Sequence, residues 1–193
     1  MLERTHRSRL SFRSNTIGGA PLSVSLGLMR ALVVGILAIT ISAARGDMPL
    51  PPPSKVTVTS PSGRIRAISD PQLGTTVEDT AQQRVLWRMP EWHRAIFVAD
   101  DGKHVVTEYD GLNLIPIDFS DDLVLLTFWR EGSKIREVRV KDLFPDHSLL
   151  RRTVSHYAWG EVEGIAEHGR LRVRRIDGTT LLFDVTTGEQ RKT

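Results

Sequence analysis

Apolar and polar residues alternate with a period of two along most of the chain after Val56. The alternation is clear in Val56–Thr59 and in Arg170–Ile176. Because successive side chains of a strand point to opposite faces, this pattern is typical of β-strands with one buried face. Asp-Gly turns, such as those at Gly102 and Gly178, separate apolar runs and indicate hairpins. The pattern therefore predicts an all-β, antiparallel domain.

Strand candidates recur at a spacing of about 8–12 residues, which is typical of a sandwich or barrel. The polar stretch Gln72–Gln83 contains Gly74 and is expected to form a loop. Lys141–Arg152 carries the only helical turn that we expect after the linker. The expected strands are Val56–Thr59, Ile65–Ala67, Arg84–Arg88, Arg94–Ala99, Lys103–Tyr109, Leu123–Trp129, Ile135–Val140, His156–Val162, Arg170–Ile176 and Thr179–Val185.

A weak repeat suggests how these strands are arranged. Residues 100–111 and 176–189 share an Asp-Gly turn followed by an apolar strand, and the second is similar to the outer strand of a propeller blade. A blade takes about 40–45 residues, so the domain has room for about three, whereas a closed propeller needs at least four. We therefore expect an antiparallel sandwich or a curled sheet of propeller-like hairpins. A propeller closed between several chains stays open as an alternative.

The first 46 residues are expected to be a targeting segment with a disordered basic leader and a signal helix. Its apolar part, Ala31–Ala44, lies between Arg30 and Arg45 and ends in small residues. A basic flank, a short apolar run and small residues are the parts of a secretory signal. An uncleaved anchor over residues 26–44 and a buried helix are the alternatives. The start of translation, at Met1 or Met29, stays open.

Charge and composition narrow the class of partner. Before Asp47 lie six of the 26 Lys and Arg residues and one of the 23 acids, so residues 47–193 carry 20 basic against 22 acidic side chains. The basic character thus belongs to the leader, and we expect no nucleic-acid partner. There is no cysteine, which excludes disulfides and thiolate metal sites. Residues 47–55 are expected to be a Pro-rich linker, and residues 56–193 a single β-domain.

About half of that domain, from Arg84 to Trp159, resembles a group of small exported bacterial proteins with propeller-like Asp-Gly hairpins. The matching stretches are VLWR, AIFVADDGKHVVTEYD, LVLLTFWREGSKIREVRVKDLFP and VSHYAW. The resemblance implies export and a β fold, and it implies no chemistry because the group has no established activity. Where the group has a Trp- or Gly-rich loop, this chain has residues 110–113, with the sequence Asp-Gly-Leu-Asn.

Ligand-contact candidates are few. Trp92 and His93 follow Pro90 in an expected loop, where an aromatic ring could stack on a ligand. Arg170, Arg172 and Arg174 alternate along one strand and could bind an acidic glycan, a phosphate or an acidic protein, although alternating charges also suit a solvated sheet face.

No motif indicates catalysis, a cofactor or a metal ion. The acids near Asp100 and Asp121 lack the spacing of a calcium loop, and the histidines lack that of a helical zinc motif. Ser155 and His156 are expected to point to opposite faces of one strand, which places them poorly for proton transfer.

These observations favour an exported, non-enzymatic β-domain, periplasmic or secreted, that binds a protein or a glycan in the cell envelope. One alternative is an extracytoplasmic hydrolase whose site is assembled across strands. Another is a propeller-like structural subunit that assembles with other copies. Contact with a membrane is expected only through an uncleaved N-terminal segment.

Overall fold

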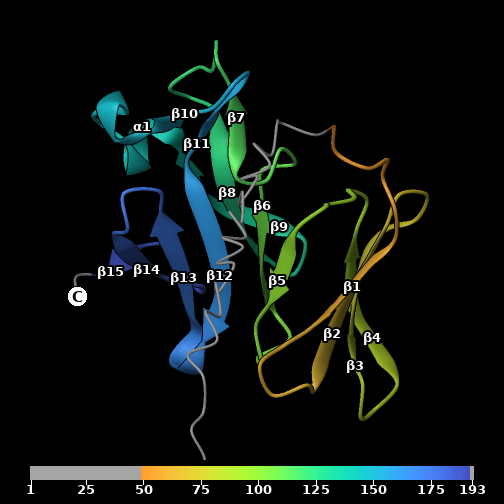
Figure 1. The fold of residues 1–193 in the computed structure, drawn as a ribbon. Coiled ribbons are helices and arrows are strands. Elements are labelled where there is room, and N and C mark those ends of the chain that lie inside the picture. The colour runs from red at the N-terminus through yellow and green to blue at the C-terminus, as the bar shows by residue number, and fades with distance from the viewer. Residues whose placement is uncertain (1–48, 192–193) are drawn as a thin grey trace, which may run out of the picture. The chain divides into compact units, whose positions relative to one another are not determined.

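A computed structural model of the chain describes residues 49–191, which are mostly β and form four antiparallel sheets, none of them closed (Figure 1). The predicted all-β, antiparallel class is confirmed. Within residues 49–191, helical structure is limited to α1 (Val140–Leu143) and the 3-10 turns η1 (His147–Leu149) and η2 (Glu167–Gly169). The strands are β1 (Val56–Thr59), β2 (Ile65–Asp70), β3 (Gly74–Asp79), β4 (Arg84–Met89), β5 (Ile96–Val98), β6 (His104–Glu108), β7 (Leu114–Pro116), β8 (Val124–Arg130), β9 (Ser133–Arg139), β10 (Arg151–Arg152), β11 (His156–Ala158), β12 (Gly160–Ala166), β13 (Arg170–Arg175), β14 (Thr180–Asp184) and β15 (Gln190–Arg191).

Three of the sheets have four strands each and follow one another along the chain. The first sheet has the order β1-β2-β3-β4, the second β5-β6-β8-β9 and the third β12-β13-β14-β15. Between β6 and β8 the chain leaves the second sheet and forms β7. This strand joins β10 and β11 in the small sheet, ordered β10-β11-β7. Short hairpins connect most neighbours, so the first strand of each four-stranded sheet is also an edge strand.

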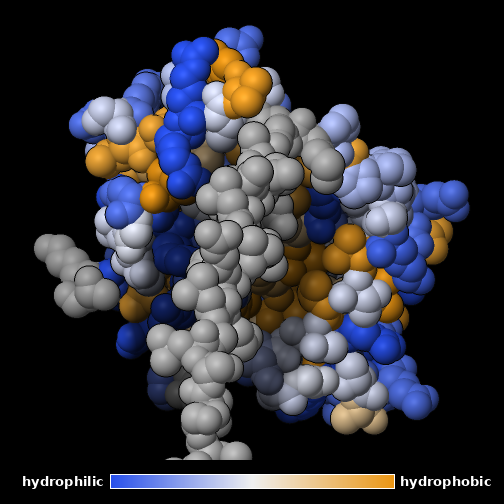
Figure 2. Space-filling model, viewed as in Figure 1, coloured by the Kyte–Doolittle hydropathy of each residue, from blue (hydrophilic) through white to orange (hydrophobic). Residues whose placement is uncertain are grey.

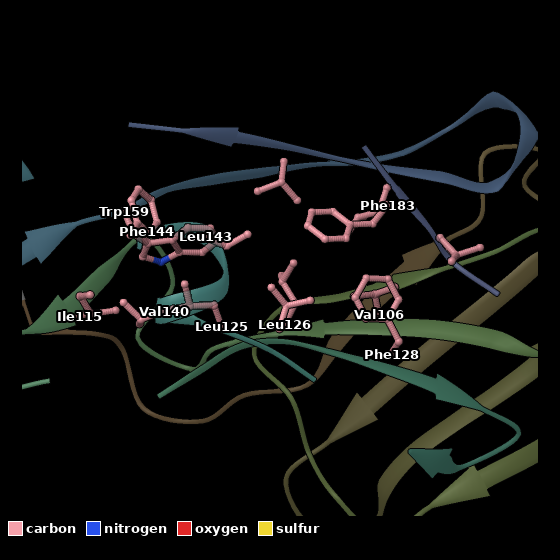
Figure 3. Packing of buried hydrophobic residues seen from close by; sticks show 14 of the residues in the cluster. Val106, Ile115, Leu125, Leu126, Phe128, Val140, Leu143, Phe144, Trp159 and Phe183 are labelled. Carbon is pink, nitrogen blue, oxygen red and sulfur yellow. The ribbon is translucent and has the colours of Figure 1, made fainter. Parts of the chain in front are cut away.

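One hydrophobic core packs between the second and third sheets (Figure 3). Phe128 of β8 and Phe183 of β14 meet across it, with 6.0 Å between their ring centroids. Trp159, Phe144 and Leu143 gather at the other end of the same core, where α1 covers it. All five side chains are buried. This core is continuous from the small sheet to the last hairpin.

A second core packs between the first and second sheets. It holds Ala67 and Val77 of the first sheet against Val105 and Trp129 of the second. The Trp129 ring nitrogen donates to the Thr107 hydroxyl at 3.0 Å, so its polar atom is satisfied inside the core. The second sheet is thus covered on both faces, whereas the first and third sheets each keep one face exposed.

The expectation of a loop over Gln72–Gln83 is wrong for its middle part, which forms β3. The strand was missed because its buried positions are mostly polar. Thr75 is fully buried; its hydroxyl donates to the Glu91 carbonyl at 2.8 Å and lies 3.1 Å from the Ser69 hydroxyl. Asp79 accepts hydrogen bonds from Arg64 and from the Gln82 amide. Buried and less buried positions do alternate in β3, but the buried side chains of Thr75 and Asp79 are polar groups held by hydrogen bonds.

A second expectation, a single strand over His156–Val162, is also wrong. The chain forms β11 in the small sheet, turns at the buried Trp159 and starts β12 in the third sheet. Gly160 permits this change because a Cβ there would lie 2.3 Å from the Arg174 carbonyl oxygen. The short strands β7, β10 and β15 were not expected, since two or three residues carry no readable period.

The expected signal helix and its apolar run Ala31–Ala44 lie outside the described residues. Within residues 49–191, no helix has the length and apolar character needed to cross a bilayer.

Candidate binding groove

The edge strands of the three large sheets meet along one groove. Strand β5 lies between β1 and β12 and contacts both of them (Figure 1). The groove, called here the edge-strand groove, has a volume of about 320 Å³, at the lower end of the roughly 300–1,000 Å³ typical of ligand pockets. Its lining residues are Val58, Thr59, Pro61, Ile96, Phe97, Val98, Glu163, Gly164 and Ile165.

The lining of this groove is mainly apolar. Val58, Phe97 and Ile165 are half-buried there, so part of each side chain reaches the groove. Figure 2 shows apolar atoms gathered in the hollow between β5 and β1. Glu163 is the single charged side chain of the lining. An occupant would therefore meet apolar side chains over most of its length.

The backbone of β5 leaves hydrogen-bonding groups directed into the groove. The Glu108 amide donates to the Ala95 carbonyl at 3.1 Å, and the Ala99 amide donates to the His104 carbonyl at 3.0 Å. Antiparallel pairing alternates, so Phe97 is hydrogen-bonded to β6, whereas the amide and carbonyl groups of Ile96 and Val98 point away from it. Among residues 49–191 these groups have no backbone hydrogen-bond partner, although Ile96 and Val98 are each only 2% exposed.

Glu163 sits at a bulge of β12, where the register with β13 shifts between Val162 and Gly164. Its carboxylate contacts the Arg172 and Arg174 guanidinium groups at 3.0 Å each. Arg174 also pairs with Glu161. The negative charges of Glu161 and Glu163 favour the charged form of the Arg174 guanidinium and so raise its pKa. The charge at the groove wall is thus balanced by its neighbours.

The predicted arginine row lies on the outer face of the third sheet. Arg170, Arg172 and Arg174 are exposed, as the alternation indicated. Arg172 and Arg174 face Glu161 and Glu163 of the neighbouring strand, so much of their charge is engaged within the sheet. That these three arginines bind an acidic ligand stays a prediction.

Trp92 and His93 lie together between β4 and β5, apart from the groove lining. The Trp92 indole donates to the Ser54 carbonyl at 2.9 Å, and the Arg94 guanidinium lies 5.2 Å from its ring centroid. Trp92 is half-buried, and this cation–π contact covers part of its ring.

The His93 side chain packs inward instead of facing a ligand. Its ring lies 5.8 Å from that of Trp129, and its backbone amide donates to the Ser69 hydroxyl at 2.7 Å. Burial lowers the pKa of His93, while Asp110 and Glu91 oppose that shift. His93 Nε2 is buried and lacks a hydrogen-bond partner among the described residues.

The acids singled out in the sequence serve turns and ion pairs. Asp100 accepts from the Ser62 amide at 2.9 Å, and Asp101 contacts His104 Nδ1 at 2.5 Å. Asp122 pairs with Arg139 and Lys141. Within residues 49–191, no three His or acidic side chains are grouped as a metal site would require.

The expectation that the Ser155 and His156 side chains point to opposite faces is wrong. The Ser155 hydroxyl lies 3.0 Å from His156 Nδ1, so the two side chains are on the same side. Opposite faces were expected because both were assigned to one strand. Ser155 instead belongs to the turn before β11, where side chains need not alternate.

The groove itself was missed by sequence reasoning. Its walls come from three segments about 40–65 residues apart, and no local pattern reports that they meet. No protein-family model matches this chain, and a comparison with curated proteins finds no significant match.

Proposed function

We propose that the chain is an exported, non-enzymatic β-domain of the cell envelope that binds a protein partner in the edge-strand groove. One observation carries the proposal: the backbone edge of β5 that has no strand partner among residues 49–191 lies in an apolar groove between β1 and β12. Sheet edges and apolar grooves are the features by which non-enzymatic domains take up polypeptide partners.

The sheet arrangement supports a partial, propeller-like fold. Each four-stranded sheet packs face to face on the next, and β1, β5 and β12, the first strand of each, lie together at the groove. Three such sheets are fewer than the four blades that a closed propeller needs. In this arrangement the first strands, β1, β5 and β12, each have one edge that is not paired with another strand among the described residues.

A glycan is the weaker choice of partner. Protein sites for sugars rely on a free aromatic face and convergent polar groups. The ring of Trp92 is already covered in part by Arg94, and the groove offers aliphatic side chains with one carboxylate. The protein partner is therefore favoured.

One specific observation favours the hydrolase alternative: the Ser155 hydroxyl contacts the His156 ring. His156 also lines a hollow of about 300 Å³ with Tyr109, Asn113 and Leu114. A serine-directed fluorophosphonate distinguishes the two functions. Covalent labelling of Ser155 that is lost in Ser155→Ala would favour the hydrolase, and an unlabelled protein would favour the binding domain.

The proposed function can be tested by photo-crosslinking in the host cell. Benzoylphenylalanine introduced at Thr59 places the photoreactive group in the groove, on an exposed position of β1. The matched control carries it at Val85, which is 41% exposed on β4 and outside the groove lining. We expect a discrete protein adduct at Thr59 and none at Val85. Equal adducts at both positions, or none, would contradict the proposal.

A further inference from the structure

We infer that the groove takes its partner as an extended polypeptide segment that adds to β5 as an extra strand of the second sheet. This inference rests on the proposed function and specifies how the groove binds. Ile96 and Val98 each direct an amide and a carbonyl group into the groove, spaced as a strand requires. Such a row of alternating donors and acceptors matches the backbone of an extended chain.

The position of β5 favours a single extended segment over the edge of a folded second copy. Strand β5 lies in the groove with β1 and β12 on either side, and both contact it. A folded sheet edge would have to bring its neighbouring strand, about 4.8 Å away, into the same space. A lone segment brings no such neighbour, so it can reach Ile96 and Val98.

The lining also defines the chemistry of the segment. Val58, Phe97 and Ile165 offer apolar contact on the two sides of β5. Glu163, the one charged group of the lining, already faces Arg172 and Arg174. We therefore expect a segment that is uncharged where it enters the groove and apolar on both of its faces, one toward Val58 and the other toward Ile165.

The probe is a phage-displayed library of random linear peptides of about ten residues, the upper length of ordinary strands. Selection uses the full chain, followed by counter-selection against Ile165→Glu, which places a charge in the groove wall. We expect enriched peptides with an uncharged, apolar run over the residues that enter the groove. Absence of any peptide that survives the counter-selection would overturn the inference.

The decisive variant is Val98→Pro. Proline removes the Val98 amide hydrogen, which points into the groove, and leaves the hydrogen bonds of Phe97 to β6 in place. Val98→Ala is the matched control, because it also removes buried side-chain atoms but keeps the amide. We expect Val98→Pro to weaken the enriched peptides by about tenfold or more relative to Val98→Ala, as loss of backbone hydrogen bonds predicts.

Two further measurements distinguish a failure of strand addition from a failure of the proposed function. If Val98→Pro does not fold, peptides N-methylated at positions facing β5 replace it, and they should bind more weakly than peptides methylated at the other positions. Equal binding by Val98→Pro and Val98→Ala, or by the two methylated series, would overturn strand addition. The groove would still be the binding site if Val58→Glu, a groove variant not used in the selection, abolished binding, whereas binding that survives Val58→Glu would contradict the proposed function as well.

Discussion

The fold strongly alters the ionisation of Glu108. It lies half-buried at the end of β6, and burial, with the charge of Glu161 as a second cause, raises its pKa to about 7. A carboxyl group with a raised pKa binds its proton more tightly in the folded state than in the unfolded state. The folded state therefore loses stability as the pH rises from the unfolded pKa, near 4.5, through about 7.

We predict that Glu108→Gln removes this loss. At about pH 8 the variant should be more stable than the wild type by up to about 3 kcal/mol, the free energy that corresponds to such a pKa shift. Near pH 4 both proteins carry an uncharged side chain there, so their stabilities should agree. Thermal unfolding across this pH range is the measurement, and a stability difference that does not change with pH would contradict the account.

At the scale of the element, turns decide where strands begin. Gly74 opens β3 with a φ of +77°, and a Cβ there would lie 2.4 Å from the Met89 carbonyl oxygen. Gly63, between β1 and β2, has a similar φ of +75° with open space around it. The pair separates two effects, since only Gly74 combines the left-handed backbone with close approach of another strand.

We predict that Gly63→Ala lowers the free energy of unfolding by about 1–2 kcal/mol, the penalty of a left-handed conformation for alanine. Gly74→Ala should lower it by more, by about 3 kcal/mol or above, because β4 must also shift. Chemical denaturation of both variants measures this. Equal losses would show that β4 does not press on Gly74.

How far the sequence predicts this fold also depends on the element. Strands with apolar inner faces, such as β13, and hairpins at Asp-Gly turns were predictable because the period and the turn residues are local. Strand β3 was not, since Thr75 and Asp79 are buried through hydrogen bonds. The groove was beyond reach for another reason: β1, β5 and β12 come together only through the packing of whole sheets.

At the scale of the whole β-domain, the second sheet packs between the first and the third, and each of these two leaves one face exposed. The exposed face of the first sheet carries the ion pair of Arg66 and Glu78. That of the third sheet carries the pairs of Arg172 and Arg174 with Glu163. Charged faces of this kind are solvated, whereas interfaces between packed sheets are apolar.

We therefore predict a monomer, contrary to the alternative of a propeller assembled from several copies. Light scattering coupled to size-exclusion chromatography should give the mass of one chain. The mass should not change when Arg66→Glu reverses one charge on the outer face of the first sheet. A defined oligomer that dissociates in this variant would favour self-assembly.

The edge of β5 that faces the groove is central to the proposed function, and amide hydrogen exchange of the unliganded protein, resolved by residue, tests it most directly. The structure predicts a slow Phe97 amide, bonded to β6, between faster Ile96 and Val98 amides that face the groove. The two faster amides should slow by about tenfold or more when an enriched peptide binds. Equal protection of all three amides in the free protein would mean that the edge is already covered, and would contradict the proposed mode of binding.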